Sequence, residues 1–242
     1  MQTYNIRKLI CLLAVTASLG ACSTTGVMHN KEQDTASKLD LVLEKAANDA
    51  YMRGDKKDSL ILIERIYKRN SNNPDAAIKY SKALRQNNHF QKASAVLSPF
   101  IYGENATNEL LTEYAYLQTA MGNYNLAKDT AMRVLENDEN AFKAKHAIGI
   151  ALDAKGHHKQ AEEYFRAALE IWEGDPIPLL NNLALSLASQ GYLDDSVNLL
   201  QKATKAAPNR MEIQRNLRII TTLQQSTNRI LMPKPIKKSG KS

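Results

Sequence analysis

The sequence predicts an all-α protein made of about five stacked helical hairpins and one further helix at the C-terminal end. Two observations predict this fold: turn residues recur at a constant interval, and small residues recur at fixed distances from each turn. The turn residues are Gly54, Asn88, Gly122, Gly156 and Gly191, which lie 34 or 35 residues apart. Glycine adopts the left-handed conformation of such turns without strain, and asparagine tolerates it better than most other residues.

Small residues flank each of these turns. Those seven residues before a turn are Ala47, Ser81, Ala115, Gly149 and Ala184, and those five residues after it are Ser59, Ala93, Ala127, Ala161 and Ser196. Because side chains at the contact set the distance between packed helices, small residues let the two helices of a hairpin approach closely. The pattern predicts hairpins at residues 40–73, 74–107, 108–141, 142–176 and 177–210.

The hairpin at 177–210 shows the pattern most clearly. Its two halves each carry apolar residues at helical spacing: Leu180, Leu183, Ala184 and Leu187, then Leu193, Val197, Leu200 and Ala203. Asp175 and Pro176 fit the cap and first residue of a helix, and Pro208 stops the second helix. In the second hairpin, Ser98-Pro99 predicts a shortened helix followed by a longer loop.

Residues 1–21 predict a lipoprotein signal peptide. Arg7-Lys8 forms a positive segment, and the apolar stretch at 9–19 is too short to span a bilayer, which needs about 20 residues. The stretch ends in Leu19-Gly20-Ala21-Cys22, which resembles the bacterial lipobox, and this resemblance implies cleavage before Cys22 and its lipidation. Cys22 would be the only cysteine of the mature chain, so it could form no internal disulfide. The alternative is ordinary secretory cleavage near Ala21, which leaves an idle thiol.

The sequence at the two ends of the mature chain indicates structures other than helical hairpins. Residues 22–37 are polar and lack apolar periodicity, so we expect a flexible tether before a repeat domain at 38–225. That domain would close with a capping helix at about 209–225, which has on one side Ile213, Leu217, Ile220 and Leu223. The alternative is half a repeat that continues into a partner. Residues 226–242, with two prolines and five basic residues, predict a disordered basic tail.

The spacing and the small residues resemble the tetratricopeptide repeat, a 34-residue helix-turn-helix unit, although the usual tryptophan at its fourth position is missing. The resemblance implies a right-handed solenoid in which the first helix of each repeat lines a groove for a partner. It assigns to that groove Asn48, Tyr51, Lys82, Arg85, Thr112, Tyr116, Thr119, Lys143, His146, Asp153 and Asn181. The alternative for each of these residues is a solvated side chain with no ligand.

Composition and motifs argue against catalysis. The formal net charge is +7, and removal of Arg7-Lys8 with the signal would leave +5, from 30 basic and 25 acidic residues. The sequence lacks the basic stripe with interleaved aromatic residues that predicts nucleic-acid binding. It also lacks a phosphate-binding loop, a zinc-protease motif and a nucleophile elbow, so we expect no enzyme activity, no cofactor and no metal.

A narrower resemblance rests on the lipobox, the repeats and the segments NNLALSLASQG, LDDSVNLLQKA and QRNLRII at 181–220. Together they are similar to the tetratricopeptide lipoproteins of tight-adherence (Flp) pilus assembly. This resemblance implies a scaffold on the periplasmic face of the outer membrane, with a secretin or other pilus and secretion components as partners. Ser23, rather than an aspartate, follows the cysteine, as in outer-membrane lipoproteins of Gram-negative bacteria. The alternatives are a pilotin-like lipoprotein of type IV pili, a periplasmic carrier or chaperone for exported polypeptides, and a regulator of cell-wall synthesis.

Overall fold

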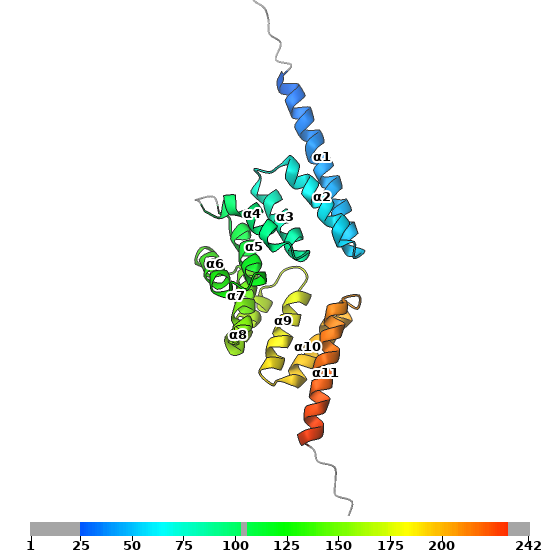
Figure 1. Cartoon of the computed structure of the whole chain (residues 1–242), viewed down its shortest axis with the longest axis vertical. Helices are drawn as coiled ribbons and strands as arrows, with labels where there is room; N and C mark the ends of the chain where they lie inside the picture. Colours follow the sequence, from blue (N-terminus) through cyan, green and yellow to red (C-terminus); the bar gives the residue numbers. More distant parts are fainter. Residues whose placement is uncertain (1–24, 103–105, 232–242) are drawn as a thin grey trace, which may run out of the picture. The chain divides into compact units, whose positions relative to one another are not determined.

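The computed structural model describes residues 25–102 and 106–231, and these residues form eleven α-helices and no strand (Figure 1). The predicted all-α class is confirmed. The signal peptide and Cys22 lie outside the described residues. The chain divides into two compact units, residues 1–42 and 43–242. The described part of the first unit is the beginning of α1 (Thr25–Met52), and the second unit contains the helical hairpins.

The helices α3 to α10 pair into hairpins at the places that the repeat spacing predicts, whereas α2 follows α1 across the turn at Gly54 and α11 comes last. Their bounds are α2 (Lys56–Arg69), α3 (Pro74–Gln86), α4 (Phe90–Ile101), α5 (Asn108–Ala120), α6 (Tyr124–Asn137), α7 (Phe142–Ala154), α8 (His158–Glu170), α9 (Ile177–Ser189), α10 (Leu193–Ala206) and α11 (Met211–Leu231). At the start of α3, the Asn73 side chain caps the helix by accepting hydrogen bonds from the backbone N–H groups of Asp75 and Ala76.

The predicted turn residues all adopt positive φ angles. Gly54, Gly122, Gly156 and Gly191 have φ between 81° and 90°, and Asn88 has φ 62°. Asn88 is the only residue other than glycine with positive φ in the described part of the chain. The constant interval between turn residues thus reflects a backbone requirement, because side chains with a Cβ atom rarely tolerate this conformation.

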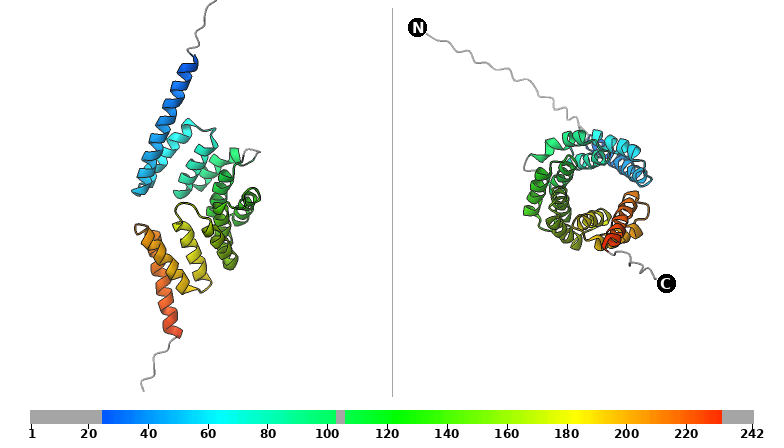
Figure 2. Two further views of the ribbon diagram at one scale, coloured as in Figure 1. Left: turned by 180° about the vertical axis from the view of Figure 1, so that it is seen from behind. Right: turned by 60° about the horizontal axis from the view of Figure 1, so that its bottom comes forward.

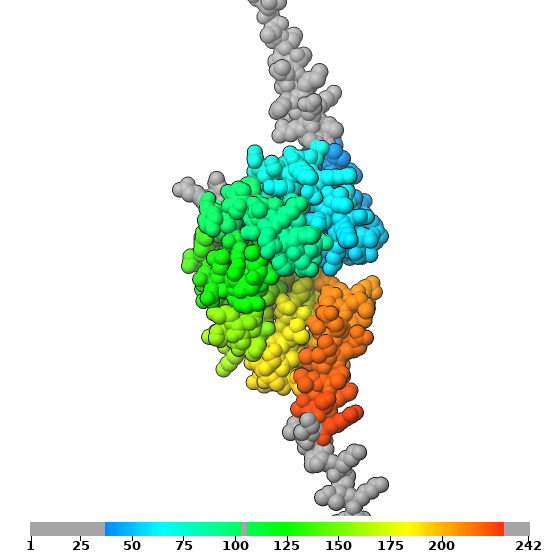
Figure 3. Space-filling model, viewed as in Figure 1, coloured from blue at the N-terminus to red at the C-terminus, as the bar shows by residue number. Residues whose placement is uncertain are grey.

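The second unit has two layers of helices (Figure 2). Contacts run directly between successive first helices of the hairpins, from α3 to α5, α7, α9 and then α11. Among the described residues, no such contact joins the second helices α2, α4, α6, α8 and α10, which pack only on first helices. The hairpins α3/α4, α5/α6, α7/α8 and α9/α10 lie side by side in chain order (Figure 3). The first helices therefore form a continuous inner layer, as in a helical solenoid.

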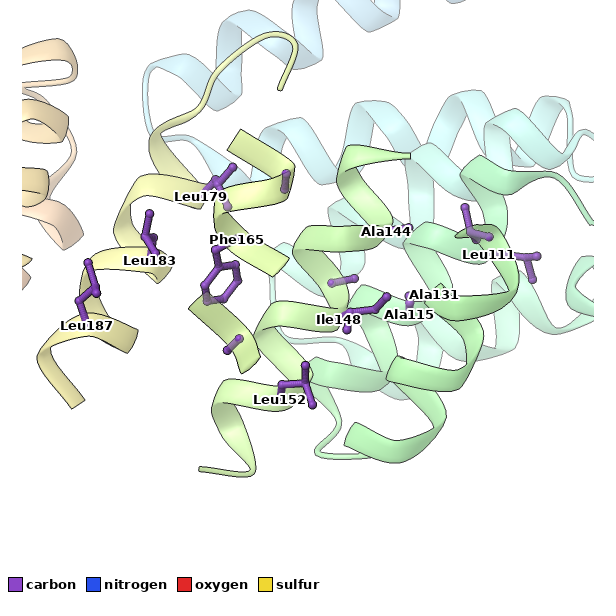
Figure 4. Packing of buried hydrophobic residues seen from close by; sticks show 14 residues of the cluster. Leu111, Ala115, Ala131, Ala144, Ile148, Leu152, Phe165, Leu179, Leu183 and Leu187 are labelled. Atoms are coloured by element: carbon purple, nitrogen blue, oxygen red, sulfur yellow. The ribbon is translucent and has the colours of Figure 1, made fainter. Parts of the chain in front are cut away.

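Small residues lie at the crossings between the layers, as predicted. Ala115, Ala161 and Ala184 are fully buried, and Gly149 faces the ring of Phe165. A Cβ atom on Gly149 would lie 2.4 Å from Phe165 Cε1. The largest apolar cluster surrounds this crossing and joins helices α5 to α9 (Figure 4). The position needs a small residue because a large side chain already fills the space in front of it.

The N-terminal end of α1 differs from the expectation. Residues 25–37, predicted to be a flexible tether, are helical, and the second compact unit begins at Leu43 rather than at residue 38. The segment has no proline, and it contains several residues that favour helices, such as Lys31, Glu32 and Ala36. A helix that is polar on all sides has no apolar periodicity, so the pattern in this segment could not reveal it.

The helix α4 is shorter than the other second helices, as Ser98-Pro99 predicts, but it does not end at the proline. The helix continues through Pro99 to Ile101 and has 12 residues, against 14 for α2, α6 and α10. Proline cannot donate to the carbonyl of Ala95, four residues earlier. The Ser98 hydroxyl donates to that carbonyl instead, at 3.1 Å. This replacement bond lets the helix pass the proline before the loop begins at Tyr102.

The last helix has the features of a cap. Ile213 and Ile220 are buried against α9 and α10 with Leu217 beside them, whereas the predicted fourth member of this face, Leu223, is 49% exposed. Arg218 is exposed and lies 34 residues after Ala184, where each earlier hairpin has a small residue. A further helix could not approach closely there. α11 extends to Leu231, so residues 226–231 of the predicted disordered tail are helical, and residues 232–242 lie outside the described part.

Candidate functional site

A pocket of about 650 Å³ lies on the inner layer of the second unit. The first helices α3, α5, α7 and α9 supply most of its lining, and the rest comes from the segments just before α7 and α9 and from Val134 on α6. We call it the groove pocket, and define it by its lining residues: Ile78, Lys82, Arg85, Gln86, Asn108, Glu109, Thr112, Glu113, Tyr116, Val134, Asp138, Asn140, Ala141, Phe142, Lys143, His146, Ile150, Trp172, Pro178 and Asn182. It therefore crosses four repeats.

Six of the predicted groove residues line this pocket. They are Lys82, Arg85, Thr112, Tyr116, Lys143 and His146. The Thr112 hydroxyl donates to the Asn108 carbonyl at 2.7 Å, so one of its hydrogen bonds is already made within α5. The structure thus brings the middle of the predicted set together around one cavity, and binding by these residues stays a prediction.

The other five predicted residues lie away from the pocket. Asn48 and Tyr51 are exposed on α1. Thr119 donates to the Ala115 carbonyl at 2.9 Å, and Asn181 accepts a hydrogen bond from Asn216 on α11 at 2.8 Å. Asp153 lies 2.7 Å from Nδ1 of His158, across the turn at Gly156. Thr119, Asp153 and Asn181 therefore have structural partners that the positional rule of the repeat could not reveal.

A buried ion pair joins the second and third repeats at one end of the pocket. Arg85 Nε and Nη2 donate to the two carboxylate oxygens of Glu113 at 2.8 and 2.9 Å. Desolvation would lower the pKa of Arg85, but the hydrogen bonds and charge of Glu113 outweigh it and raise that pKa. The guanidinium also lies 5.3 Å from the ring centre of Tyr116. The Arg85 charge is thus already balanced within the protein.

His146 links the third, fourth and fifth repeats through hydrogen bonds. The Tyr116 hydroxyl donates to the Lys143 carbonyl at 2.9 Å, so its oxygen is left to accept from Nδ1 of His146, 3.0 Å away. The amide of Asn182 donates to Nε2 of His146 at 2.9 Å. A single proton on Nδ1 satisfies both ring nitrogens. Burial lowers the pKa of His146 to about 4, so the ring is neutral near pH 7.

Because His146 is buried and neutral, we expect the folded protein to lose stability in acid. Its pKa of about 4 in the folded state lies below its ordinary value of 6.5, so the unfolded chain takes up the proton first as pH falls. The free energy of unfolding is expected to be unaffected by His146 above pH 6.5 and to fall by roughly 3 kcal/mol as pH decreases to about 4, at about 1.36 kcal/mol per pKa unit. Urea unfolding of the protein and of His146→Gln at pH 7 and pH 4 measures this difference. Equal pH dependence of the two proteins would contradict a neutral, buried His146.

Aromatic residues form one wall of the pocket. The rings of Phe142 and Trp172 have centres 4.9 Å apart, and the ring of His146 is 5.3 Å from that of Trp172, almost perpendicular to it. Trp172 Nε1 donates to the Asp175 carbonyl at 3.0 Å, and Gly174 has φ 84°. The one-residue excess of this repeat thus falls in the loop that holds Trp172 against Phe142.

Sequence reasoning missed most of the residues that line the pocket, and three of them, Glu113, Asn182 and Trp172, make contacts described above. Glu113 and Asn182 occupy the sixth position of their repeats, next to the fifth position that the family pattern assigns to the groove. Trp172 lies in the loop before α9, which a pattern of helix positions does not cover. The signal that could have found it is the extra residue of the repeat at 142–176, combined with the single tryptophan of the sequence.

Two further findings concern metals and membranes. Within residues 25–102 and 106–231, no group of three or more His, Cys, Asp or Glu side chains could hold a metal ion. In the same residues, no helix combines the length and the apolar character that crossing a membrane requires.

Comparisons with known proteins agree with the fold. Two family models, both described as tetratricopeptide repeat, match residues 142–171 and 179–205, which lie within the fourth and fifth predicted repeats. A tetratricopeptide-repeat protein from Thermus thermophilus superposes with a TM-score of 0.66 at 16% identity, and covers 76% of this chain and 99% of its own. Another, from Parabacteroides merdae, has a TM-score of 0.51 at 15% identity, with 80% and 77% of the two chains covered. A search of curated proteins finds no match.

Proposed function

We propose that this tetratricopeptide-repeat protein is a scaffold that holds a segment of a partner protein in the groove pocket and performs no catalysis. The observation that carries the proposal is the position of the pocket. It crosses the inner helices of four repeats, each of which contributes polar side chains, and aromatic side chains line it from α5, from α7 and from the loop before α9. Stacked repeats present such extended surfaces to protein partners. The amides of Gln86, Asn140 and Asn182 can bond the backbone of an extended segment, while the aromatic residues provide rigid contact area.

We further propose that Cys22 carries a lipid that anchors the chain to the periplasmic face of the outer membrane, where the scaffold assists assembly of a tight-adherence (Flp) pilus or secretion apparatus. The support is the sequence resemblance to TadD, the tetratricopeptide lipoprotein of that system. The segment at 181–220 is the most specific part of this resemblance. Several acyl chains would anchor the protein firmly, at about 0.8 kcal/mol per buried methylene.

The anchor is tested by Cys22→Ser in the full chain. We expect the variant to remain uncleaved or to leave the detergent phase, because the lipid can form only on this thiol. Cys11→Ser is the matched control, since Cys11 lies within the predicted signal, and it should partition like the unchanged protein. Detergent-phase partitioning of Cys22→Ser equal to that of the unchanged protein would refute lipidation.

The scaffold role is tested by recovering partners from detergent-solubilised membranes. We expect secretin or other pilus components to be recovered with the unchanged protein and lost with Lys82→Glu/Lys143→Glu, which reverses two exposed charges at the pocket. The matched control is Lys202→Glu/Lys205→Glu, which reverses two exposed charges on α10, outside the pocket. Equal recovery with both double variants would show that the pocket is not the binding site, and recovery of unfolded client peptides instead would favour a carrier.

A further inference from the structure

The aromatic wall of the groove pocket is formed by Phe142 and Trp172 with the ring of His146. Phe142 and Trp172 are only partly buried, although their rings pack on each other and on His146. Ile150 and Pro178 line the same cavity and add aliphatic surface. Partly exposed rings that are fixed by packing and by the Trp172–Asp175 hydrogen bond lose little entropy on binding. Such a wall suits an inserted apolar side chain.

The interior beside this wall offers no unbalanced charge. Arg85 makes two hydrogen bonds to Glu113, whose side chain is 6% exposed, so the pair leaves no net charge for a ligand to meet. The two ring nitrogens of His146 are satisfied by Tyr116 and Asn182. A charged ligand group placed here would lose its hydration without finding a counter-ion. The electrostatic complement of this interior is therefore a neutral side chain.

The remaining charges of the pocket are of both signs. Lys82 and Lys143 line it as exposed cations, and Glu109 and Asp138 line it as carboxylates. One Asp138 oxygen accepts a hydrogen bond from the Asn140 backbone, and the Lys143 ammonium lies 5.7 Å from the ring centre of Phe142. Two cations and two anions give no net attraction for a strongly acidic or basic partner. The charge balance favours a segment of low net charge.

We infer that the groove pocket is specific for an extended segment of a partner protein that has low net charge and inserts one neutral aromatic or branched aliphatic side chain against Phe142 and Trp172. This inference rests on the proposed scaffold function and names the chemistry of its ligand. It assigns a specificity role to the irregular loop before α9, because that loop places Trp172 in the pocket. Acidic peptides, basic peptides and the basic C-terminal residues of a second copy do not fit this chemistry.

A random peptide library displayed on phage tests the inference against the full chain in detergent. We expect the enriched peptides to share an aromatic or branched aliphatic residue in a context of low net charge. Trp172 is the only tryptophan in the chain, so a synthetic copy of an enriched peptide that itself lacks tryptophan should change the intrinsic fluorescence on binding. Replacement of its apolar residue by glutamate or lysine should weaken binding roughly 10-fold or more, as expected for a central anchor.

Variants of the protein locate the binding. Phe142→Ala should weaken the peptide roughly 10-fold, whereas Tyr192→Ala, which removes an exposed aromatic residue outside the pocket, should leave affinity unchanged. The fluorescence test needs no variant, so it holds even if Phe142→Ala is unstable. The inference would be overturned if the enriched peptides were highly charged, did not change the fluorescence of Trp172, and lost affinity for Lys82→Glu/Lys143→Glu. That result would leave the scaffold function standing. Peptides insensitive to every pocket variant, or no enrichment at all, would overturn both.

Discussion

Replacement of Phe165 by alanine is expected to lower the free energy of unfolding by about 3–5 kcal/mol, the usual cost of removing a fully buried aromatic ring. Phe165 on α8 has no exposed surface and packs in the cluster that joins α5 to α9. Its loss would leave a cavity between the two layers of helices. Urea or thermal unfolding followed by circular dichroism measures the change.

A second substitution tests the reason for this cost. Gly149→Ala alone should destabilise by about 1–3 kcal/mol through overpacking, because its Cβ would lie 2.4 Å from the Phe165 ring. In a Phe165→Ala background the clash disappears, and alanine is favoured over glycine within a helix by about 1 kcal/mol. We therefore expect Gly149→Ala to be neutral or stabilising there. Equal costs of Gly149→Ala in both backgrounds would contradict the crossing of α7 and α8 described above.

Arg85→Met is expected to lower the free energy of unfolding by roughly 3 kcal/mol, because it leaves the buried Glu113 carboxylate without its partner. The double variant Arg85→Met/Glu113→Leu should recover most of this loss, since it removes both charges and fills the space with apolar atoms. Chemical unfolding of the two single variants and the double variant gives the coupling energy between the residues.

An ion pair on the surface provides the control for this cycle. Arg166 and Glu162 lie one turn apart on α8, and the Arg166 side chain is 55% exposed. Arg166→Met should therefore cost no more than about 0.5 kcal/mol. A cost for Arg85→Met as small as that for Arg166→Met would show that the Arg85–Glu113 pair does not hold α3 to α5.

Features set by local backbone geometry were predictable from the sequence. The five turns were found because positive φ restricts the residue to glycine or asparagine, and this restriction repeats along the chain. The layer crossings were found because they exclude large side chains, and Gly149 facing Phe165 is the clearest case. Both rules act on one or two residues at a time, so a single sequence displays them.

Features that depend on contacts between repeats were not predictable in the same way. The Arg85–Glu113 pair joins residues 28 positions apart, and Asn182 reaches His146 from 36 positions away. The family pattern pointed to Arg85 and His146 but gave no sign of Glu113 or Asn182. Asn181 was assigned to the groove, yet it bonds Asn216 on the capping helix, because α11 packs beside α9. A difference of one position along α9, between Asn181 and Asn182, decides whether a side chain bonds the capping helix or lines the groove pocket.

The proposed binding face is tested most directly by a photo-crosslinking amino acid placed at single positions of the protein in its native cells. Position 82 lies at the groove pocket on α3, and position 202 is exposed on α10 in the other layer. We expect position 82 to capture one defined segment of a partner protein, identified by mass spectrometry, and position 202 to capture none. Capture of the same partner at position 202 and not at position 82 would contradict a binding face on the inner layer.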